Sequence, residues 1–328
     1  MSDLISEKLD ILIDFKNGKK APKEDGDVPI YGGNGILGYC NKWNFENILV
    51  IGRVGAYCGS VHIVNGRCWV SDNAIAAIPK NQLELEYYYY LLGQLNLNKK
   101  HIGSSQPLLT QGILNSIETK ISSNVSNRIS TANVLSDLDA KIVLNNKINT
   151  ELEAMAKLIY DYWFVQFDFP DENGKPYKTS AGEMVYNEEL KREIPDGWEY
   201  GYVNDLYNFQ YGLGNTNPDN GGMYPIYGSN GVIGGYNEYN NEDAPVIGHI
   251  GNNCGSLIYA YGKHYVTYNG VMCKIKEPYD KFFGYCTLLS KDLKRRTRGS
   301  SQKFISYDLI NQLDFIIPSK KVMKLFCD

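Results

Sequence analysis

The sequence repeats itself at a constant distance. PIYGGNGILGY begins at Pro29, and PIYGSNGVIGGY begins at Pro225, 196 positions later. From Pro29 to Ser60, 17 of the 32 aligned positions are identical, whereas chance at average residue frequencies gives about two. The same spacing joins two GSSQ segments, which begin at Gly103 and Gly299. The chain therefore carries two copies of one domain, and both copies must adopt the same fold.

Each copy is predicted to form short strands joined by tight turns. Apolar and β-branched runs at 48–51, 60–64 and 74–78 are bounded by Gly, Asn and Pro, as is typical of strands between turns. A short helix is expected at 84–94, with its counterpart at 280–289. The predicted fold class is therefore α+β, with mixed strands and short helices in both copies.

A different pattern lies between the copies. From about residue 122 to 165 there is neither Gly nor Pro, and apolar residues recur every three or four positions with one gap of six. The pattern predicts one amphipathic helix of about 40 residues, about 60 Å long. A helix of this length needs a partner to cover its apolar stripe, as in a coiled coil. The stripe consists of Leu135, Leu138, Ile142, Ile148, Leu152, Met155, Ile159 and Tyr162.

These features predict the division of the chain. The expected segments are a first domain at 1–121, a spacer helix at 122–166, a polar linker at 167–195, a second domain at 196–320 and a helix stub at 321–328. The constant offset places residue 1 opposite Gly197 and Asp328 opposite Ala132. On this register the second copy stops where its own long helix is expected to begin.

The composition excludes several classes of protein. With 43% hydrophobic and 21% charged residues, the chain is predicted to be globular. No apolar run approaches the roughly 20 residues of a membrane span, and the start MSDLISEKLD lacks the features of a secretion signal. Seven scattered cysteines without a C-x-x-C pair argue against structural zinc and favour a reduced, cytoplasmic protein. Cys58 and Cys254, which are repeat equivalents, are expected in the core.

One motif raises the alternative of a nucleotide-binding enzyme. Gly33-x-Gly35-x-x-Gly38 matches the dinucleotide-binding fingerprint, which requires a helix directly after it and an acidic residue about 20 positions on. Here GILGYCNKWNF follows, and the second copy has Ser229 in place of the first glycine. No G-x-x-x-x-G-K-[ST], H-E-x-x-H or G-x-S-x-G motif is present. The sequence therefore predicts a binding protein with neither a catalytic centre nor a metal.

Two groups of residues recur in register and suit nucleic acid, although the net charge is −4. The first is an Asn-Gly turn preceded by tyrosine, where the backbone can approach a ligand closely. The second is a basic run against each GSSQ loop, with Lys and Arg for phosphates and Ser and Gln for phosphates or base edges. The predicted DNA contacts are Tyr31, Asn34, Arg53, Lys99, Lys100, Ser104, Ser105, Gln106, Tyr227, Asn230, His249, Arg295, Arg296, Arg298, Ser300, Ser301, Gln302 and Lys303.

Several positions that are expected to lie in exposed turns differ between the copies. Arg53 stands opposite His249, and similar exchanges pair Tyr57 with Asn253 and Asp72 with Tyr268. A homodimeric reader recognises a palindrome, because its two reading surfaces are identical. Two diverged copies on a rigid spacer are instead expected to read two unlike half-sites.

The arrangement resembles the specificity subunit of a type I restriction-modification system. The resemblance rests on YGxNGxxG followed by VIGxxG, on the GSSQ loops, on ELEAMAKLIYDYWFVQF and on IPDGW, and it covers nearly the whole chain. It implies two target-recognition domains that bind a bipartite target in double-stranded DNA. It further implies a spacer helix that docks adenine methyltransferase subunits, which a restriction subunit then joins. On this resemblance the chain has no cofactor, because S-adenosylmethionine and Mg-ATP belong to the partner subunits.

The sequence departs from the family pattern in its second long helix. Family members pack two such helices antiparallel, and here the second is expected to be missing. The stripe of the first helix is then covered by a second copy of the chain or by the methyltransferase. The other possibility that the sequence leaves open is a truncated or decoy allele that binds methyltransferase without recognising a site.

Overall fold

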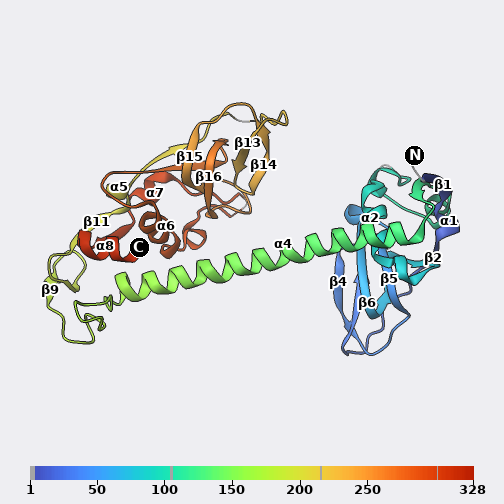
Figure 1. Ribbon diagram of the computed structural model, residues 1–328, viewed down its shortest axis with the longest axis horizontal. Helices are drawn as coiled ribbons and strands as arrows, with labels where there is room; N and C mark the ends of the chain where they lie inside the picture. Colours follow the sequence, from blue (N-terminus) through green and yellow to red (C-terminus); the bar gives the residue numbers. More distant parts are fainter. Residues whose placement is uncertain (1–3, 104–105, 215, 301) are drawn as a thin grey trace. The chain divides into compact units, whose positions relative to one another are not determined.

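The computed structural model describes residues 4–103, 106–214, 216–300 and 302–328. The chain divides into two compact units, Met1–Lys147 and Ile148–Asp328. Each unit contains one six-stranded sheet with short helices beside it (Figure 1).

The sheet of the first unit has the strand order β2-β7-β5-β6-β3-β4. Neighbouring strands are antiparallel except for β3 and β6, which are parallel. A separate two-stranded antiparallel sheet pairs β1 with β8. The strands are β1 (Leu4–Lys8), β2 (Ile13–Asn17), β3 (Val28–Gly32), β4 (Gly35–Cys40), β5 (Phe45–Gly52), β6 (Val61–Val70), β7 (Ala74–Pro79) and β8 (Glu118–Ser122). The helices are α1 (Leu9–Leu12), η1 (Gly55–Tyr57), η2 (Gln82–Glu84), α2 (Leu85–Gln94), η3 (Leu97–Lys99) and α3 (Gln111–Ser116).

The apolar run of β5 is explained by burial on both faces of the sheet. Leu49 and Ile51 point to one side, where they pack with the helices in a core that contains Tyr88 and Leu92 of α2. Val50 points to the other side, into a smaller core formed by the strands alone. A strand that is covered on both faces reads as a continuous apolar run instead of an alternating one. The expected strands and the short helix at 84–94 are therefore confirmed, with boundaries that differ by a few residues.

The second unit repeats this architecture, with the sheet order β12-β17-β15-β16-β13-β14 and the separate pair β11 with β18. Its strands are β9 (Met184–Asn187), β10 (Arg192–Pro195), β11 (Glu199–Tyr202), β12 (Tyr207–Tyr211), β13 (Tyr224–Gly228), β14 (Gly231–Tyr236), β15 (Asn241–Gly248), β16 (Leu257–Val266), β17 (Gly270–Ile275) and β18 (Asp314–Ile317). Its helices are α5 (Val203–Leu206), α6 (Lys281–Ser290), η5 (Leu293–Arg296), α7 (Tyr307–Asn311) and α8 (Lys320–Cys327).

The strand pairing corrects the register at the start of each copy. Ile13 of β2 and Tyr207 of β12 face equivalent residues of β7 and β17. These two residues are 194 positions apart and not 196. The placement of residue 1 opposite Gly197 is therefore wrong by two, because the second copy has two additional residues between its first two sheet strands.

The predicted spacer is the helix α4 (Val125–Tyr160), which continues through the Asn145-Asn146 pair without a break. It passes from the first unit into the second between Lys147 and Ile148. A π-helical turn, Asp161–Val165, ends it. The expectation of one long helix is confirmed, and the helix begins at Val125 because Ser122 ends β8.

The segment expected to be a polar linker is folded. Residues 167–195 contain the β9–β10 hairpin, and Phe167 and Phe169 within it are buried. Phe169 stacks on Trp198 with the ring centroids 4.9 Å apart. This aromatic packing makes the segment part of the core of the second unit. Residues 321–327 of the expected stub belong to α8, which begins at Lys320 and is capped by Ser319.

Candidate nucleic-acid interface

Three segments of the first unit meet at one edge of the sheet. They are the β3–β4 turn, the stretch that follows β5, and the loop that contains the first GSSQ segment. His62 Nε2 lies 3.0 Å from the Gly33 carbonyl of the turn. The Gly55 N–H donates to the Pro107 carbonyl (3.1 Å), and the Leu109 N–H donates to Arg53 (2.9 Å). Backbone hydrogen bonds thus join the stretch after β5 to the loop, and the side chain of His62 in β6 contacts the turn.

The same three segments meet in the second unit. Ser256 Oγ donates to the carbonyl of Ser229, in the β13–β14 turn (3.1 Å). The Gly251 N–H donates to the Lys303 carbonyl (2.9 Å), and the Ile305 N–H donates to His249 (3.0 Å). The repeated motifs of the sequence therefore form one repeated surface, which each unit carries separately.

The glycine that begins each GSSQ loop is required by the backbone. Gly103 and Gly299 have φ angles of +88° and +93°, in the region that favours glycine. A Cβ atom would lie 2.6 Å from the Gln106 carbonyl oxygen in the first loop and 2.3 Å from that of Gln302 in the second. These glycines therefore let each loop turn tightly.

The basic residues lie on exposed backbone beside these loops. Lys99 and Lys100 are exposed at the end of η3, and Arg295 and Arg296 are exposed in η5. Arg295 makes an ion pair with Asp292 (2.9 Å) while its side chain stays 87% exposed. An exposed ion pair of this kind is weak, so Arg295 remains able to exchange its partner for a phosphate.

The loop residues themselves are partly described. Gln106 in the first unit, and Arg298, Ser300, Gln302 and Lys303 in the second, are exposed. The predicted contacts Ser104, Ser105 and Ser301 lie outside the described residues.

The two tyrosines before the turns are half-buried. Tyr31 packs against the small core of the first sheet, with its ring centroid 6.5 Å from that of His62. Tyr227 packs against the small core of the second sheet, with its ring centroid 5.3 Å from that of His264. Burial raises the pKa of both phenols. Each tyrosine therefore packs against the core next to its turn, and only part of its ring is exposed.

The asparagines of the turns are at the surface. Asn34 and Asn230 are both exposed. Asn253 Nδ2 donates to Asn230 Oδ1 (2.8 Å), which joins the turn to the stretch after β15. Both asparagines are therefore placed where a ligand can reach them.

Arg53 and His249, which occupy equivalent positions in the two copies, are less exposed than the asparagines of the turns. Arg53 is half-buried. His249 is only 5% exposed, because its ring packs on Tyr211 (4.3 Å between centroids) and its Nδ1 lies 2.6 Å from the Ile305 carbonyl. The histidine holds the loop to the sheet, so its ring is not presented as a direct DNA contact.

The structure adds aromatic residues that the predicted contacts left out. Tyr57 is 53% exposed on the first unit, and Tyr268 (40%) and Phe304 (42%) are exposed on the second. Tyr57 and Tyr268 occupy positions that differ between the copies, so a comparison of the two copies could have identified them from the sequence. Phe304 is marked by its position directly after the basic loop.

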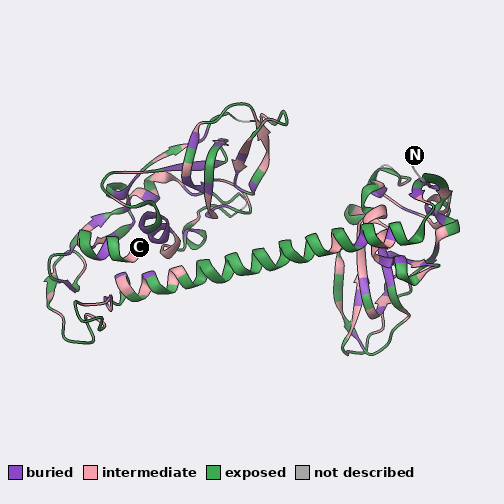
Figure 2. Ribbon diagram, in the orientation of Figure 1, coloured by how far each residue is buried: buried purple, intermediate pink, exposed green. Residues whose placement is uncertain are grey.

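The apolar stripe of the spacer helix is largely uncovered. Figure 2 shows the central turns of α4 as exposed along their whole length. Leu135 is half-buried, and the other seven stripe residues are exposed: Leu138 50%, Ile142 56%, Ile148 43%, Leu152 58%, Met155 52%, Ile159 42% and Tyr162 38%. A continuous exposed apolar face of this kind marks an interaction surface.

The described residues do not support the alternative of a nucleotide-binding enzyme. The glycines at 33–38 lie in the β3–β4 hairpin, so a strand follows them where the fingerprint requires a helix. Within the described ranges, no cluster of His, Cys, Asp and Glu side chains suits a metal ion. No described helix is long and apolar enough to span a membrane. Cys58 and Cys254 are buried, as expected.

Comparison with known proteins gives consistent matches. The family model described as the type I restriction modification DNA specificity domain matches residues 8–154 and 195–324. The chain is 34% identical over 139 residues to the type I restriction enzyme MjaIX specificity subunit of Methanocaldococcus jannaschii, which is 41% of this chain and 30% of that protein. It is 30% identical over 119 residues to the EcoprrI specificity subunit of Escherichia coli, which is 36% of this chain and 29% of that protein. The alignments thus span about a third of each relative.

The fold also has a solved counterpart. The crystal structure of the type I restriction-modification system S subunit from M. genitalium superposes with a TM-score of 0.59 at 20% identity. The match covers 98% of this chain and 87% of that one. At this identity the likeness concerns the fold, which is that of two similar domains and a long helix.

Proposed function

Because this chain belongs to the family of type I restriction modification DNA specificity domains, we propose that it is the DNA-recognition subunit of a type I restriction-modification complex. Each recognition domain reads one half of a bipartite target in double-stranded DNA, and α4 fixes the gap between the halves. One observation carries the proposal. In each unit a turn, a strand end and a basic loop converge at one exposed edge, with different side chains in the two copies.

The proposed contacts divide by chemistry. Lys99, Lys100, Arg295 and Arg296 bind phosphates and supply affinity that does not depend on sequence. The exposed asparagines of the turns and the exposed glutamines of the GSSQ loops reach base edges and supply specificity. His249 positions its loop and makes no base contact itself.

We propose that the chain recognises DNA and catalyses no reaction itself. Its curated relatives are named specificity subunits. S-adenosylmethionine and Mg-ATP are then bound by the methyltransferase and restriction subunits, and this chain binds neither. Titration of the isolated chain with each cofactor tests this, and saturable binding of either one would contradict it.

The exposed stripe of α4 is the proposed docking face for methyltransferase subunits. Seven apolar side chains between 38% and 58% exposed face solvent along it, and coverage by another helix would stabilise them. A second copy of the chain is the competing occupant.

Replacement of Arg295 and Arg296 by alanine tests the DNA interface. Affinity for every duplex should fall, because two phosphate contacts are lost. The slope of log K against log salt should decrease in size by about one to two. Fluorescence anisotropy at several salt concentrations measures both quantities.

Lys178→Ala is the matched control, because Lys178 is exposed in the same unit and away from the loops. It should leave the salt slope unchanged. If the double variant behaves like this control, the basic loop does not contact DNA.

A further inference from the structure

A cluster of aromatic rings lies at the edge of the second unit where the turn, the strand end and the basic loop converge. The Tyr211 ring packs on His249 (4.3 Å between centroids), on Tyr307 (4.6 Å) and on Tyr268 (5.6 Å). His249 also packs on Tyr268 (5.4 Å). These four residues come from the end of β12, the stretch after β15, the β16–β17 turn and the beginning of α7. Four segments thus hold the cluster in place.

Hydrogen bonds tie the cluster to the proposed DNA interface. Ser229 Oγ, in the β13–β14 turn, lies 3.0 Å from the Asn269 carbonyl, and the His249 N–H donates to the same carbonyl (2.8 Å). Asn269 directly follows Tyr268 in the β16–β17 turn. Tyr268 therefore lies beside the asparagine turn and the strand end.

Phe304 closes the basic loop of the same edge. Its N–H donates to the Arg298 carbonyl, and the Arg298 N–H donates to the Phe304 carbonyl, both at 2.8 Å. The next residue, Ile305, accepts at its carbonyl from the His249 ring or lies within 2.6 Å of its Nδ1. Phe304 is thus anchored beside the aromatic cluster.

Two rings at this edge are open to solvent. Tyr268 is 40% exposed and Phe304 is 42% exposed. Tyr211 and Tyr307 are half-buried and His249 is buried, so they form a packed base beside Tyr268. Large aromatic side chains that are held exposed on a packed base mark an interaction surface.

The first unit has no aromatic residue at any of the equivalent positions. The strand pairing and the constant offset align the two sets. The exchanges from the first unit to the second are Asn17 to Tyr211, Arg53 to His249, Asp72 to Tyr268, Leu108 to Phe304 and Gln111 to Tyr307. The two edges share a backbone but differ in chemistry.

The cations next to Phe304 are also specific to the second unit. Arg298 and Lys303 are both exposed beside it. The first unit has Ile102 and Pro107 at these positions. The second unit has therefore acquired an exposed ring together with two groups that bind phosphates.

The form of the DNA decides what such rings can contact. In an intact duplex the faces of the bases are covered by their neighbours, and only the base edges reach the grooves. The side chain of Phe304 has no hydrogen-bonding group with which to read a base edge. A ring gains a large contact with a base only where the stack opens, as when apolar side chains enter a base step and kink the duplex.

We infer that the second unit binds DNA at an opened base step, with Tyr268 and Phe304 stacked on the bases that the opening uncovers. Arg298 and Lys303 hold the phosphates beside this step. The inference rests on the proposed DNA recognition and adds the form of DNA that the second unit prefers. The first unit, without these rings, reads an intact duplex through polar side chains.

Two duplexes of the same sequence test this with the full chain, one fully paired and one with a single unpaired adenine. An unpaired base lowers the cost of opening the stack. The bulged duplex should therefore bind about fivefold more tightly or better, a factor typical of stacking on one aromatic ring. Fluorescence anisotropy measures both affinities.

The double variant Tyr268→Ala with Phe304→Ala should bind the two duplexes with equal affinity. No charge is changed, so the slope of log K against log salt should stay that of the wild type. An unchanged slope also shows that the basic loop remains folded and in contact with phosphates.

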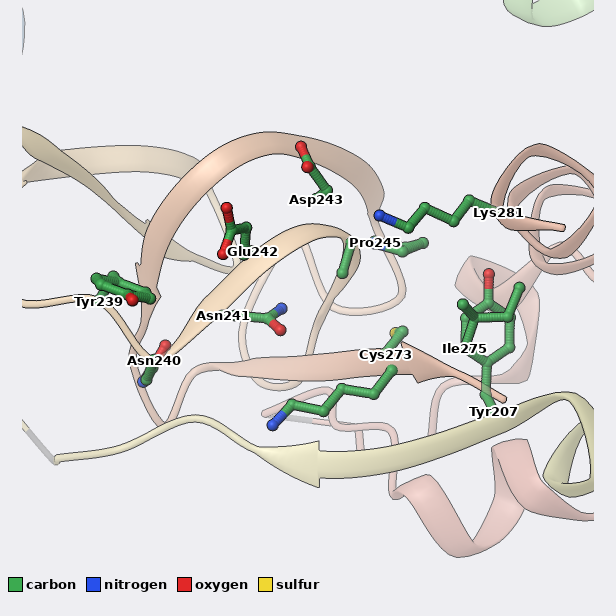
Figure 3. A pocket seen from close by; sticks show the side chains of 12 residues that line it. Tyr207, Tyr239, Asn240, Asn241, Glu242, Asp243, Pro245, Cys273, Ile275 and Lys281 are labelled. Carbon is green, nitrogen blue, oxygen red and sulfur yellow. The ribbon is translucent and has the colours of Figure 1, made fainter. Parts of the chain in front are cut away.

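Tyr239→Ala with Phe282→Ala is the matched control. These rings are 45% and 44% exposed in the same unit. Figure 3 shows Tyr239 and Lys281, the neighbour of Phe282, at the cavity beside the beginning of β15, whereas His249 follows the other end of that strand. This variant should keep the preference for the bulged duplex.

The outcomes separate this inference from the proposed function. Equal affinity of the wild type for both duplexes would overturn the inference and leave DNA recognition intact. A preference that survives in the Tyr268 and Phe304 double variant would overturn it as well. Failure of the wild type to bind either duplex would contradict the proposed function itself, and the inference with it.

Discussion

Glu84 and Arg128 form a buried ion pair that joins α4 to the first unit. Arg128 Nε lies 2.6 Å from Glu84 Oε2, with the side chains 8% and 2% exposed. Burial by itself would raise the pKa of Glu84, but hydrogen bonds from Arg128, Tyr88 and Asn81 outweigh it and lower that pKa. The second unit has Asp280 at the position of Glu84, where it caps α6. The pair is therefore specific to the first unit.

Glu84→Gln should destabilise the first unit by roughly 3–5 kcal/mol at neutral pH, because Arg128 then stays buried without a counter-charge. The folded-state pKa of Glu84 is below its unfolded value of about 4.3. Its contribution is therefore present above that pH and is lost as the pH falls through the folded pKa. Urea unfolding of both proteins should show a difference that shrinks in acid.

The exposed pair Glu172–Lys321 supplies the control, with 3.0 Å between its charged atoms and both side chains mostly exposed. Glu172→Gln should leave the unfolding midpoint unchanged. If Glu84→Gln also leaves it unchanged at neutral pH, the buried pair does not hold α4 to the domain.

At the scale of the elements, the duplication made most of the fold predictable. Because the same strand and turn patterns occur twice, each copy supports the assignment of the other, and the long helix follows from the absence of Gly and Pro. The two-residue shift before β3 was not predictable, since identity between the copies is low there. The burial of His249 was also hidden, because it depends on Tyr211 and Ile305, which are 38 and 56 positions away.

Substitution of Ile142 and Leu152 by glutamate tests the role of α4. Both side chains are more than half exposed, so the unfolding midpoint should stay close to that of the wild type. Co-purification of the methyltransferase and self-association of the chain should both fall sharply, because charges are placed on the apolar face. Sedimentation velocity and affinity co-purification measure the two effects.

Ala140→Glu is a suitable control, because Ala140 is exposed and lies on the opposite side of the helix from Leu138 and Ile142. It should preserve both associations. A wild-type chain that is monomeric, together with unchanged methyltransferase binding in the double variant, would show that the stripe is not a docking face.

At the scale of the whole molecule, the duplication separates shared structure from individual specificity. The sheets, the turns and the glycine-dependent loops are common to both copies. The exposed positions around them differ, as at Tyr57 and Asn253 or at Asp72 and Tyr268. One ancestral surface has thereby become two, each with its own side chains, in a single chain.

The central claim is that the two units read unlike half-sites. Mapping of methylated adenines in DNA from cells that express this chain with its methyltransferase tests it most directly. The expected result is an asymmetric target with two different short halves and a fixed, unspecified gap, and exchange of one recognition domain should change only one half. A single contiguous target, or a symmetric one, would contradict the claim.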